Sequence, residues 1–172
     1  MQKYFQMREK AANEGLDFLF KTPVSHDEYL VIYEGSVDED ECISWKPVKM
    51  TAQQDFTSLE NEFNITFHQT IVDYFNAYWF AELNGFYKEY YITLEPVLSN
   101  IQMNLFGESL RGYKNNHEGL LKNIPIGMEG NGLVVVVENM SGIISLEDFE
   151  RGTFEYLAQN IQELIENLRL KR

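Results

Sequence analysis

Carboxylates are the side chains of this sequence that are best placed to do chemistry. Four are consecutive in the run Asp38-Glu-Asp-Glu41, and the segment from Asp27 to Glu95 holds 14 acidic and three basic residues. Three positive minus 14 negative charges give −11, most of the formal net charge of −13 at pH 7. Charge of this sign attracts cationic polypeptide and repels nucleic-acid phosphates and anionic lipid headgroups. The sequence therefore predicts a basic protein segment as partner, and no nucleic acid.

The acidic run Asp38–Glu41 also has a simpler interpretation. Consecutive charges between two strand-like segments are typical of a solvated turn that keeps a domain soluble. A binding role for these four residues follows only if the turn borders a concave face of the protein.

The residue types that enzymes use most often form no recognisable catalytic set. His26, His68 and His117 are far apart and lack metal-ligand spacing such as H-E-x-x-H. Cys42 follows four acids, whose field disfavours a reactive thiolate. The glycine-rich stretch Gly127–Gly132 precedes a predicted strand, whereas a phosphate cradle follows a strand and opens a helix. We expect a non-catalytic protein without metal or cofactor; an enzyme that uses paired carboxylates is the weaker alternative, and it would need a closed pocket.

The length favours a single domain over residues 1–172. We expect this domain in the cytoplasm. The single cysteine forms no internal disulfide, and no signal peptide is apparent at the start. The longest apolar run, Leu133–Val137, is far shorter than the roughly 20 residues of a membrane-spanning helix. We therefore expect a peripheral association with the inner membrane, through protein rather than lipid.

Hydrophobic periodicity predicts helices at both ends of the chain and in the middle. Apolar residues recur at three-to-four-residue spacing from Phe56 to Trp79, as one kinked helix or two, until Gly85. Phe63, Phe67, Tyr74 and Phe75 are expected in the core. The other predicted helices cover Tyr4–Phe20, a short segment at Ser99–Leu105, and Phe154–Leu168.

β-Branched and aromatic runs between turn residues predict the strands. They are Tyr29–Tyr33, Cys42–Trp45, Tyr90–Leu94, and a hairpin of Gly132–Glu138 and Ile143–Leu146 around the turn Asn139–Gly142. The order of elements predicts an α+β fold, a mostly antiparallel sheet with helices packed on it.

Three groups of residues occur in a characteristic order along the chain. They are Ile43–Pro47 through Ser58–Ile65 and Thr70–Phe75 to Phe80-Ala81; Ile101–Leu110; and Glu138–Gly142 with Tyr156–Leu168. In this order they resemble the Syd family of cytoplasmic proteins that bind SecY, a subunit of the bacterial protein-export channel. Residues 1–42 resemble that family only loosely. The stretch Ile124–Gly127, the hairpin after it and the last helix also resemble the wider SUKH superfamily, to which Syd is related.

The resemblance implies a non-catalytic protein whose acidic concave face engages basic cytoplasmic loops of SecY, with a role in monitoring channel assembly. The SUKH superfamily includes toxin-neutralising immunity proteins. The alternative function is therefore occlusion of a cognate toxin by a comparable face.

The candidate partner-binding residues are two aromatic residues, Tyr78 and Trp79, and six acids that could share an exposed face with them. Carboxylate and aromatic groups together suit Lys and Arg, through ion pairing and cation–π contact. The alternative is that the rings belong to the core and the acids are merely solvated. The candidates are Glu60, Glu62, Tyr78, Trp79 and Glu82 in and after the central helical region, and Glu108, Glu129 and Glu138 further on.

Overall fold

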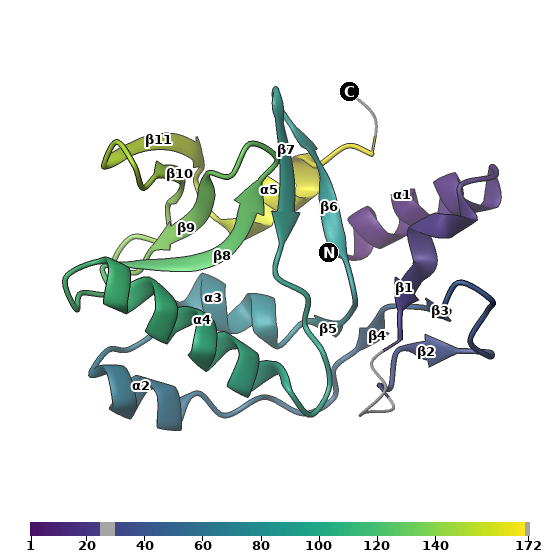
Figure 1. Ribbon diagram of the computed structural model, residues 1–172, viewed down its shortest axis with the longest axis horizontal. Helices are drawn as coiled ribbons and strands as arrows, with labels where there is room; N and C mark the ends of the chain where they lie inside the picture. Colours follow the sequence, from purple (N-terminus) through teal and green to yellow (C-terminus); the bar gives the residue numbers. More distant parts are fainter. Residues whose placement is uncertain (25–29, 171–172) are drawn as a thin grey trace.

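An antiparallel six-stranded sheet lies at the centre of the fold in the computed structural model, which describes residues 1–24 and 30–170 (Figure 1). The spatial order is β11-β10-β9-β8-β7-β6. The bounds are β6 (Leu83–Tyr87), β7 (Tyr90–Leu94), β8 (Asn123–Glu129), β9 (Val134–Glu138), β10 (Ile144–Asp148) and β11 (Thr153–Ala158).

Five α-helices and two small sheets surround this sheet within the described residues. Figure 1 shows α1 and the three-stranded sheet β1-β3-β2 at one end of the molecule, and β10 and β11 at the other. The remaining bounds are α1 (Gln2–Asn13), the 3-10 turn η1 (Asp17–Phe20), β1 (Lys21–Pro23), β2 (Tyr33–Glu34), β3 (Cys42–Trp45), the pair β4 (Val48–Lys49) and β5 (Tyr78–Trp79), α2 (Thr57–Phe63), α3 (Gln69–Phe75), α4 (Gln102–Asn116) and α5 (Ile161–Asn167). The predicted α+β class is confirmed.

The large sheet curls until its two edges meet at the turn between β6 and β7. The hydroxyl of Tyr90 donates to Glu155 Oε1 at 2.6 Å, and Lys88 Nζ donates to the carbonyl of Leu157 at 3.2 Å. Both acceptors lie on β11, at the opposite edge from β6. The curl brings sequence-distant ends of the sheet together, and α5 packs against β11 and α3.

The core is rich in aromatic side chains. The ring centroid of Phe106 on α4 lies 4.4 Å from that of Phe75 and 5.5 Å from that of Phe67. Phe63 and Tyr74 are also buried, so the four core aromatics predicted in the central region are confirmed. No helix in the described part of the chain has the length and apolar character of a membrane span.

Three predicted elements are confirmed: the strand Tyr90–Leu94 as β7, the strand Cys42–Trp45 as β3, and the hairpin as β9 and β10. The first helix was predicted too long, because α1 ends at Asn13 and a separate 3-10 turn follows. The predicted strand Tyr29–Tyr33 is wrong for Leu30–Ile32, which precede β2; Tyr29 lies outside the described residues.

The central helical region is two helices, separated at Asn64, whose left-handed backbone (φ 54°) ends α2. Tyr78 and Trp79 were predicted to be helical, but they form β5 because they pair with β4. The final helix starts at Ile161 rather than Phe154, because residues 153–158 pair with β10 and Asn160 caps α5. The helix predicted near Ser99 starts later and runs to Asn116, and strands β6 and β8 were not predicted.

Candidate binding site

Two surface hollows meet at Gln2 and Tyr78, which line both. The α3–α5 hollow has a volume of about 660 Å³ and lies between α3, α5, β4–β5 and the start of α1. The α1–β3 hollow has a volume of about 520 Å³ and lies between α1 and β3. We call the two together the furrow.

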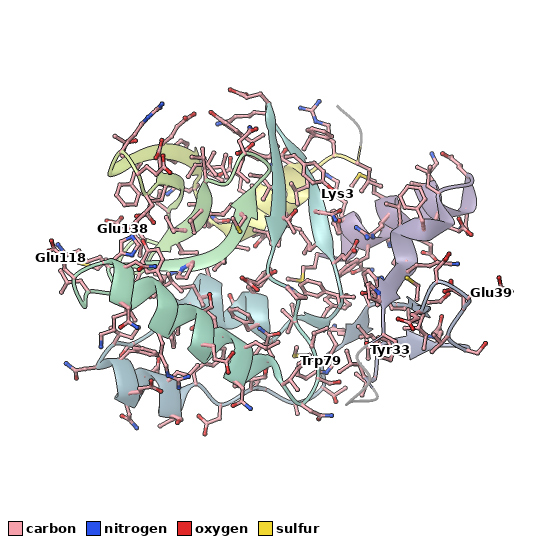
Figure 2. The ribbon with its side chains drawn as sticks, in the orientation of Figure 1. Lys3, Tyr33, Glu39, Trp79, Glu118 and Glu138 are labelled. Carbon is pink, nitrogen blue, oxygen red and sulfur yellow. The ribbon has the colours of Figure 1, made fainter. Side chains whose placement is uncertain are left out.

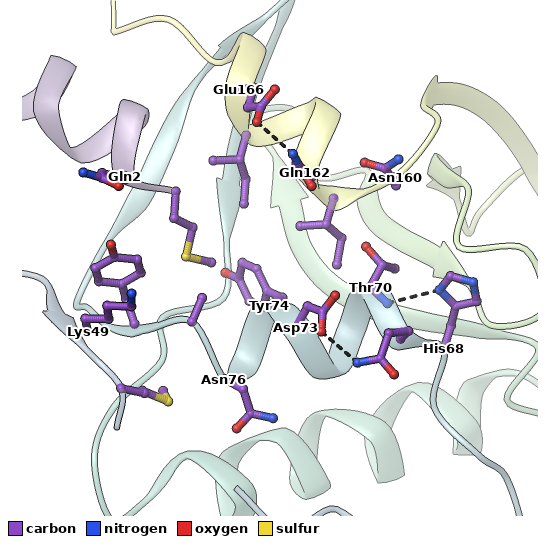
Figure 3. A pocket seen from close by; sticks show the side chains of 17 residues that line it. Gln2, Lys49, His68, Thr70, Asp73, Tyr74, Asn76, Asn160, Gln162 and Glu166 are labelled. Atoms are coloured by element: carbon purple, nitrogen blue, oxygen red, sulfur yellow. Dashed lines mark hydrogen bonds between the residues drawn. The ribbon is translucent and has the colours of Figure 1, made fainter. Parts of the chain in front are cut away.

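Two matching side-chain pairs line the α3–α5 hollow (Figure 3). Gln69 Nε2 donates to Asp73 Oδ1 at 2.7 Å on α3, and Gln162 Nε2 donates to Glu166 Oε1 at 2.9 Å on α5. Residues four apart lie on the same face of a helix, so each helix turns an amide and a carboxylate into the hollow. The amides are neutral, and no ion pair among the described residues includes Asp73 or Glu166. The N-terminal ammonium of Met1, which lines the same hollow, interacts electrostatically with Glu166 without forming an ion pair.

The same hollow has an apolar floor. Ile161 and Ile165 of α5 are buried there, with Met50 packed against the core. The hydroxyl of Tyr74 donates to the carbonyl of Glu95. Tyr74 is fully buried, and this burial raises the pKa of its phenol well above the usual value. The phenol therefore stays neutral, and charge in this hollow is confined to its exposed rim.

Hydrogen bonds from the β9–β10 turn fix the start of α3. His68 Nδ1 accepts from the backbone N–H of Thr70 at 3.2 Å and so caps the helix. The backbone N–H of His68 donates to Asn139 Oδ1 at 2.9 Å, and Asn139 Nδ2 donates to the carbonyl of Thr66 at 2.8 Å. The stretch Glu138–Gly142 thus positions one wall of the furrow.

The α1–β3 hollow is built from one face of α1 and from β3 with its neighbours. Gln2, Phe5, Gln6 and Glu9 follow the three-to-four-residue spacing that places side chains on one side of a helix. The ring of Tyr78 meets that of Phe5 edge-on at 5.6 Å. The floor is therefore aromatic at the point where the two hollows join.

Each hollow has two carboxylates and one lysine among its described lining residues. Glu9 and Glu34 line the α1–β3 hollow, and Lys46, its only described cation, forms an ion pair with Glu34. Lys49 is the only lysine or arginine among the described lining residues of the other hollow. The furrow is open to solvent, and three of its carboxylates, Asp73, Glu166 and Glu9, form no ion pair within the described residues.

Of the eight candidate partner-binding residues, Tyr78 alone lines either hollow. Trp79 lies beside it on β5 and is half-buried. Glu82 pairs with buried Arg8 at 2.6 Å. Glu60 accepts from the backbone N–H of Phe67 at 2.9 Å and closes the α2–α3 connection.

The other four candidates lie on different elements. Glu62 binds Arg111 through both oxygens, at 2.6 and 2.8 Å, and this contact lowers the pKa of its carboxyl. Glu108 is exposed on α4, and Glu138 accepts from the Ser141 hydroxyl. Glu129 is only 5% exposed and holds Asn131 in the next turn. Figure 2 shows Glu138 and Trp79 well separated, so the structure does not gather the eight into one surface.

The acidic run Asp38–Glu41 forms the tip between β2 and β3 and lines neither hollow. Asp38 Oδ2 lies 2.7 Å from Lys21 Nζ, and this hydrogen bond lowers the pKa of the Asp38 carboxyl. The next three acids are exposed, and Figure 2 shows Glu39 at the end of the molecule opposite Glu138. The run is a solvated turn away from the furrow.

The histidines and the cysteine have separate environments. His68 caps α3, whereas His117, at the end of α4, has its Nε2 2.6 Å from Glu147 Oε1. Cys42 is half-buried in β3, and His26 lies outside the described residues. Gly127 belongs to β8 and the glycines after it to the β8–β9 turn, so the glycine-rich stretch opens no helix.

The curled antiparallel sheet, the helices around it and the open carboxylate-bearing furrow define a small α+β domain with an open surface site. A family model described as Syd protein (SUKH-2) matches residues 2–169, and the chain belongs to the Syd family. The resemblance read from the sequence is confirmed.

Two curated relatives carry the name Protein Syd. The one from Idiomarina loihiensis is 24% identical over 171 residues, which cover 92% of this chain and 93% of the relative. The one from Psychromonas ingrahamii is 26% identical over 135 residues, which cover 76% of this chain and 72% of the relative. The family match over residues 2–169 includes the helices and strands that form the furrow.

Proposed function

We propose that this protein binds the SecY subunit of the export channel by taking a basic cytoplasmic segment of SecY into the furrow. Membership of the Syd family points to SecY, and the furrow is the part of the surface that suits an extended polypeptide. Binding of this kind needs no catalysis. It would hold the protein at the cytoplasmic side of the inner membrane through the channel alone.

The observation that carries the proposal is the pair of exposed carboxylates in the α3–α5 hollow, which form no ion pair among the described residues. Asp73 and Glu166 are exposed, accept only from neutral glutamine amides, and flank an apolar floor. A lysine or arginine of the partner would form an ion pair with these carboxylates, and its methylene groups would pack on the floor. Glu9 offers the same chemistry in the adjoining hollow.

Net charge supports the proposal at longer range. At −13, the whole molecule attracts a basic loop before contact, which raises the association rate and weakens with salt. Each exposed contact is worth only about 0.2–1 kcal/mol, so several must act together. A continuous furrow with carboxylates at intervals meets that requirement better than one acidic cluster.

The test is the affinity of a synthetic peptide from a basic cytoplasmic SecY loop, measured by calorimetry. The variant Asp73→Asn/Glu166→Gln keeps the glutamine contacts and removes two charges. Its matched control, Glu39→Gln/Asp40→Asn, makes the same change in net charge at the distant β2–β3 tip. We expect about a twofold to fivefold loss per furrow carboxylate and much less in the control.

Two results would contradict the proposal. Equal losses in the two variants would assign the effect to net charge rather than to the furrow. An affinity that does not change between low and high salt would argue against any charged interface. Co-purification with SecY from solubilised membranes, lost in the furrow variant and kept in the control, extends the test to the intact channel.

A further inference from the structure

Trp45 carries a buried hydrogen-bond donor without an acceptor. The side chain is only 2% exposed, and its indole Nε1 has no partner among the described residues. The indole ring lies 5.1 Å from that of Phe20, and the guanidinium carbon of Arg8 lies 5.4 Å from the ring centroid. A buried indole N–H nearly always has a partner, because an unpaired one costs about 1–3 kcal/mol.

Trp45, which carries this donor, lines the α1–β3 hollow. Around it the floor is aromatic, with Phe5, Phe20 and Tyr78, and the rim is polar. An apolar floor with one or a few fixed polar groups is typical of a ligand site, where the polar group sets the orientation of what binds. Nε1 is the group on this floor that is free to do so.

The charges nearby decide which acceptor suits it. Arg8 has no N–H group left to bind an anion, because its five N–H groups are directed to Leu19, Tyr4, Asn84 and Glu82, and Glu82 offsets its charge. On the rim, Lys46 is paired with Glu34, and the unpaired Glu9 repels a carboxylate or phosphate. The acceptor that fits is therefore neutral, and a positive charge beside it is favourable.

We infer that the α1–β3 hollow binds the main chain of an extended polypeptide, one of whose carbonyl oxygens accepts a hydrogen bond from Trp45 Nε1. A basic side chain next to that carbonyl would face Glu9. The inference rests on the proposed function and gives this part of the furrow its role: the carboxylates attract the segment, and Trp45 fixes its position. Because Nε1 is enclosed in the free protein, a rim side chain must move outward as the segment enters.

The experiment is a titration of the ¹⁵N-labelled full chain with the basic SecY loop peptide, observed at the indole N–H signals. The sequence has two tryptophans, and Trp79→Phe assigns the Trp45 signal. We expect that signal to move downfield on saturation, as a new hydrogen bond requires. Trp45→Phe should weaken binding by about twofold to tenfold, while Trp79→Phe, on β5 but lining neither hollow, should not.

The outcomes separate this inference from the function on which it rests. Peptide binding with an unmoved Trp45 indole signal would overturn the inference and leave the furrow proposal intact. A water cross-peak to the indole proton in both free and bound protein would assign the acceptor to an ordered water, and would also overturn it. Absence of peptide binding by the unsubstituted chain would refute both. Even if Trp45→Phe does not fold, the titration of the wild-type chain shows whether the Trp45 indole N–H gains a hydrogen bond on binding.

Discussion

Arg8 Nη2 lies 2.6 Å from Glu82 Oε2, and this ion pair ties α1 to the residue that precedes β6. The Arg8 side chain is fully buried, whereas that of Glu82 is 39% exposed. The rest of the guanidinium donates to Tyr4, Asn84 and the carbonyl of Leu19. Because α1 forms a wall of the furrow, this buried cation holds the site in place without lining it.

Removing the charge of Glu82 should therefore destabilise the fold. Glu82→Gln leaves a buried guanidinium without its counter-ion, and we expect the free energy of unfolding in urea to fall by about 1–3 kcal/mol. Glu62→Gln, which breaks the exposed pair with Arg111, is the control and should cost at most about 1 kcal/mol. Equal effects would show that the Arg8–Glu82 pair has no special role in stability. A charge-reversing substitution at Glu82 would therefore destabilise the fold, and a loss of SecY binding in such a variant would not show that Glu82 contacts SecY.

Gly142→Ala should damage both the fold and the furrow. Gly142 has a φ of 77°, and an added Cβ would lie 2.5 Å from Cε1 of the His68 ring that caps α3. The matched control is Gly152→Ala, which has a φ of 63° and no heavy atom within 4 Å of the added Cβ. The backbone conformation should lower the free energy of unfolding by about 1 kcal/mol in each variant. In Gly142→Ala the clash with His68 should lower it by about 1 kcal/mol more.

Because His68 lines the α3–α5 hollow, only the Gly142 variant should also bind the SecY loop peptide more weakly. Urea unfolding and calorimetry test the two effects separately. If the two alanine variants were equally stable and bound equally well, His68 would not be constrained by the β9–β10 turn.

Glu95 should make stability depend on pH. Burial raises the pKa of its carboxyl, so the folded chain holds a proton in a range where the unfolded chain has released it. Its contribution is therefore most favourable below the unfolded pKa of about 4.3 and is lost as pH rises through the higher folded pKa. Glu95→Gln should raise the free energy of unfolding at pH 7 and leave it nearly unchanged at pH 3.5.

The comparison for this variant is Glu89→Gln, at an exposed carboxyl in the β6–β7 turn. It should change the pH profile little. A Glu95→Gln variant that gains as much stability at pH 3.5 as at pH 7 would assign the gain to packing or to the amide rather than to the proton.

Local patterns predicted the elements whose residues belong to one strand or one turn. Tyr90–Leu94 and the β9–β10 hairpin are β-branched or aromatic runs with turn residues between them, and they fold as expected. Phe154, Leu157, Ile161 and Leu164 also have helical spacing, but Asn160 divides them between β11 and α5. Phe154 and Leu157 belong to a strand because β11 pairs with β10. That pairing is a long-range contact, which the periodicity of a local segment cannot predict.

The candidate site was harder to predict because ion pairs depend on topology. Glu82 and Glu62 are neutralised by Arg8 and Arg111, which lie far from them in the sequence. Asp73 and Glu166 did have a local signal, since each follows a glutamine by four residues on a helix. Only the packing of α3 beside α5 shows that the two pairs face one hollow.

Tyr78 should bind the partner through its ring rather than its hydroxyl. It lines both hollows and packs edge-on against Phe5, so a cationic side chain that passes between the hollows must cross it. Tyr78→Phe should keep the affinity for the SecY loop peptide within about twofold, whereas Tyr78→Leu should weaken it by about twofold to fivefold.

Salt separates the ring from the carboxylates. The ring acts at contact distance, so the loss in Tyr78→Leu should persist at high salt, while the loss in Asp73→Asn/Glu166→Gln shrinks as the charges are screened. Trp79→Phe is the neighbouring control on β5 and should bind as the wild type does. Unchanged affinity in Tyr78→Leu, with the variant shown to be folded by its urea transition, would remove the aromatic contact from the proposed interface and leave binding to the carboxylates and Trp45.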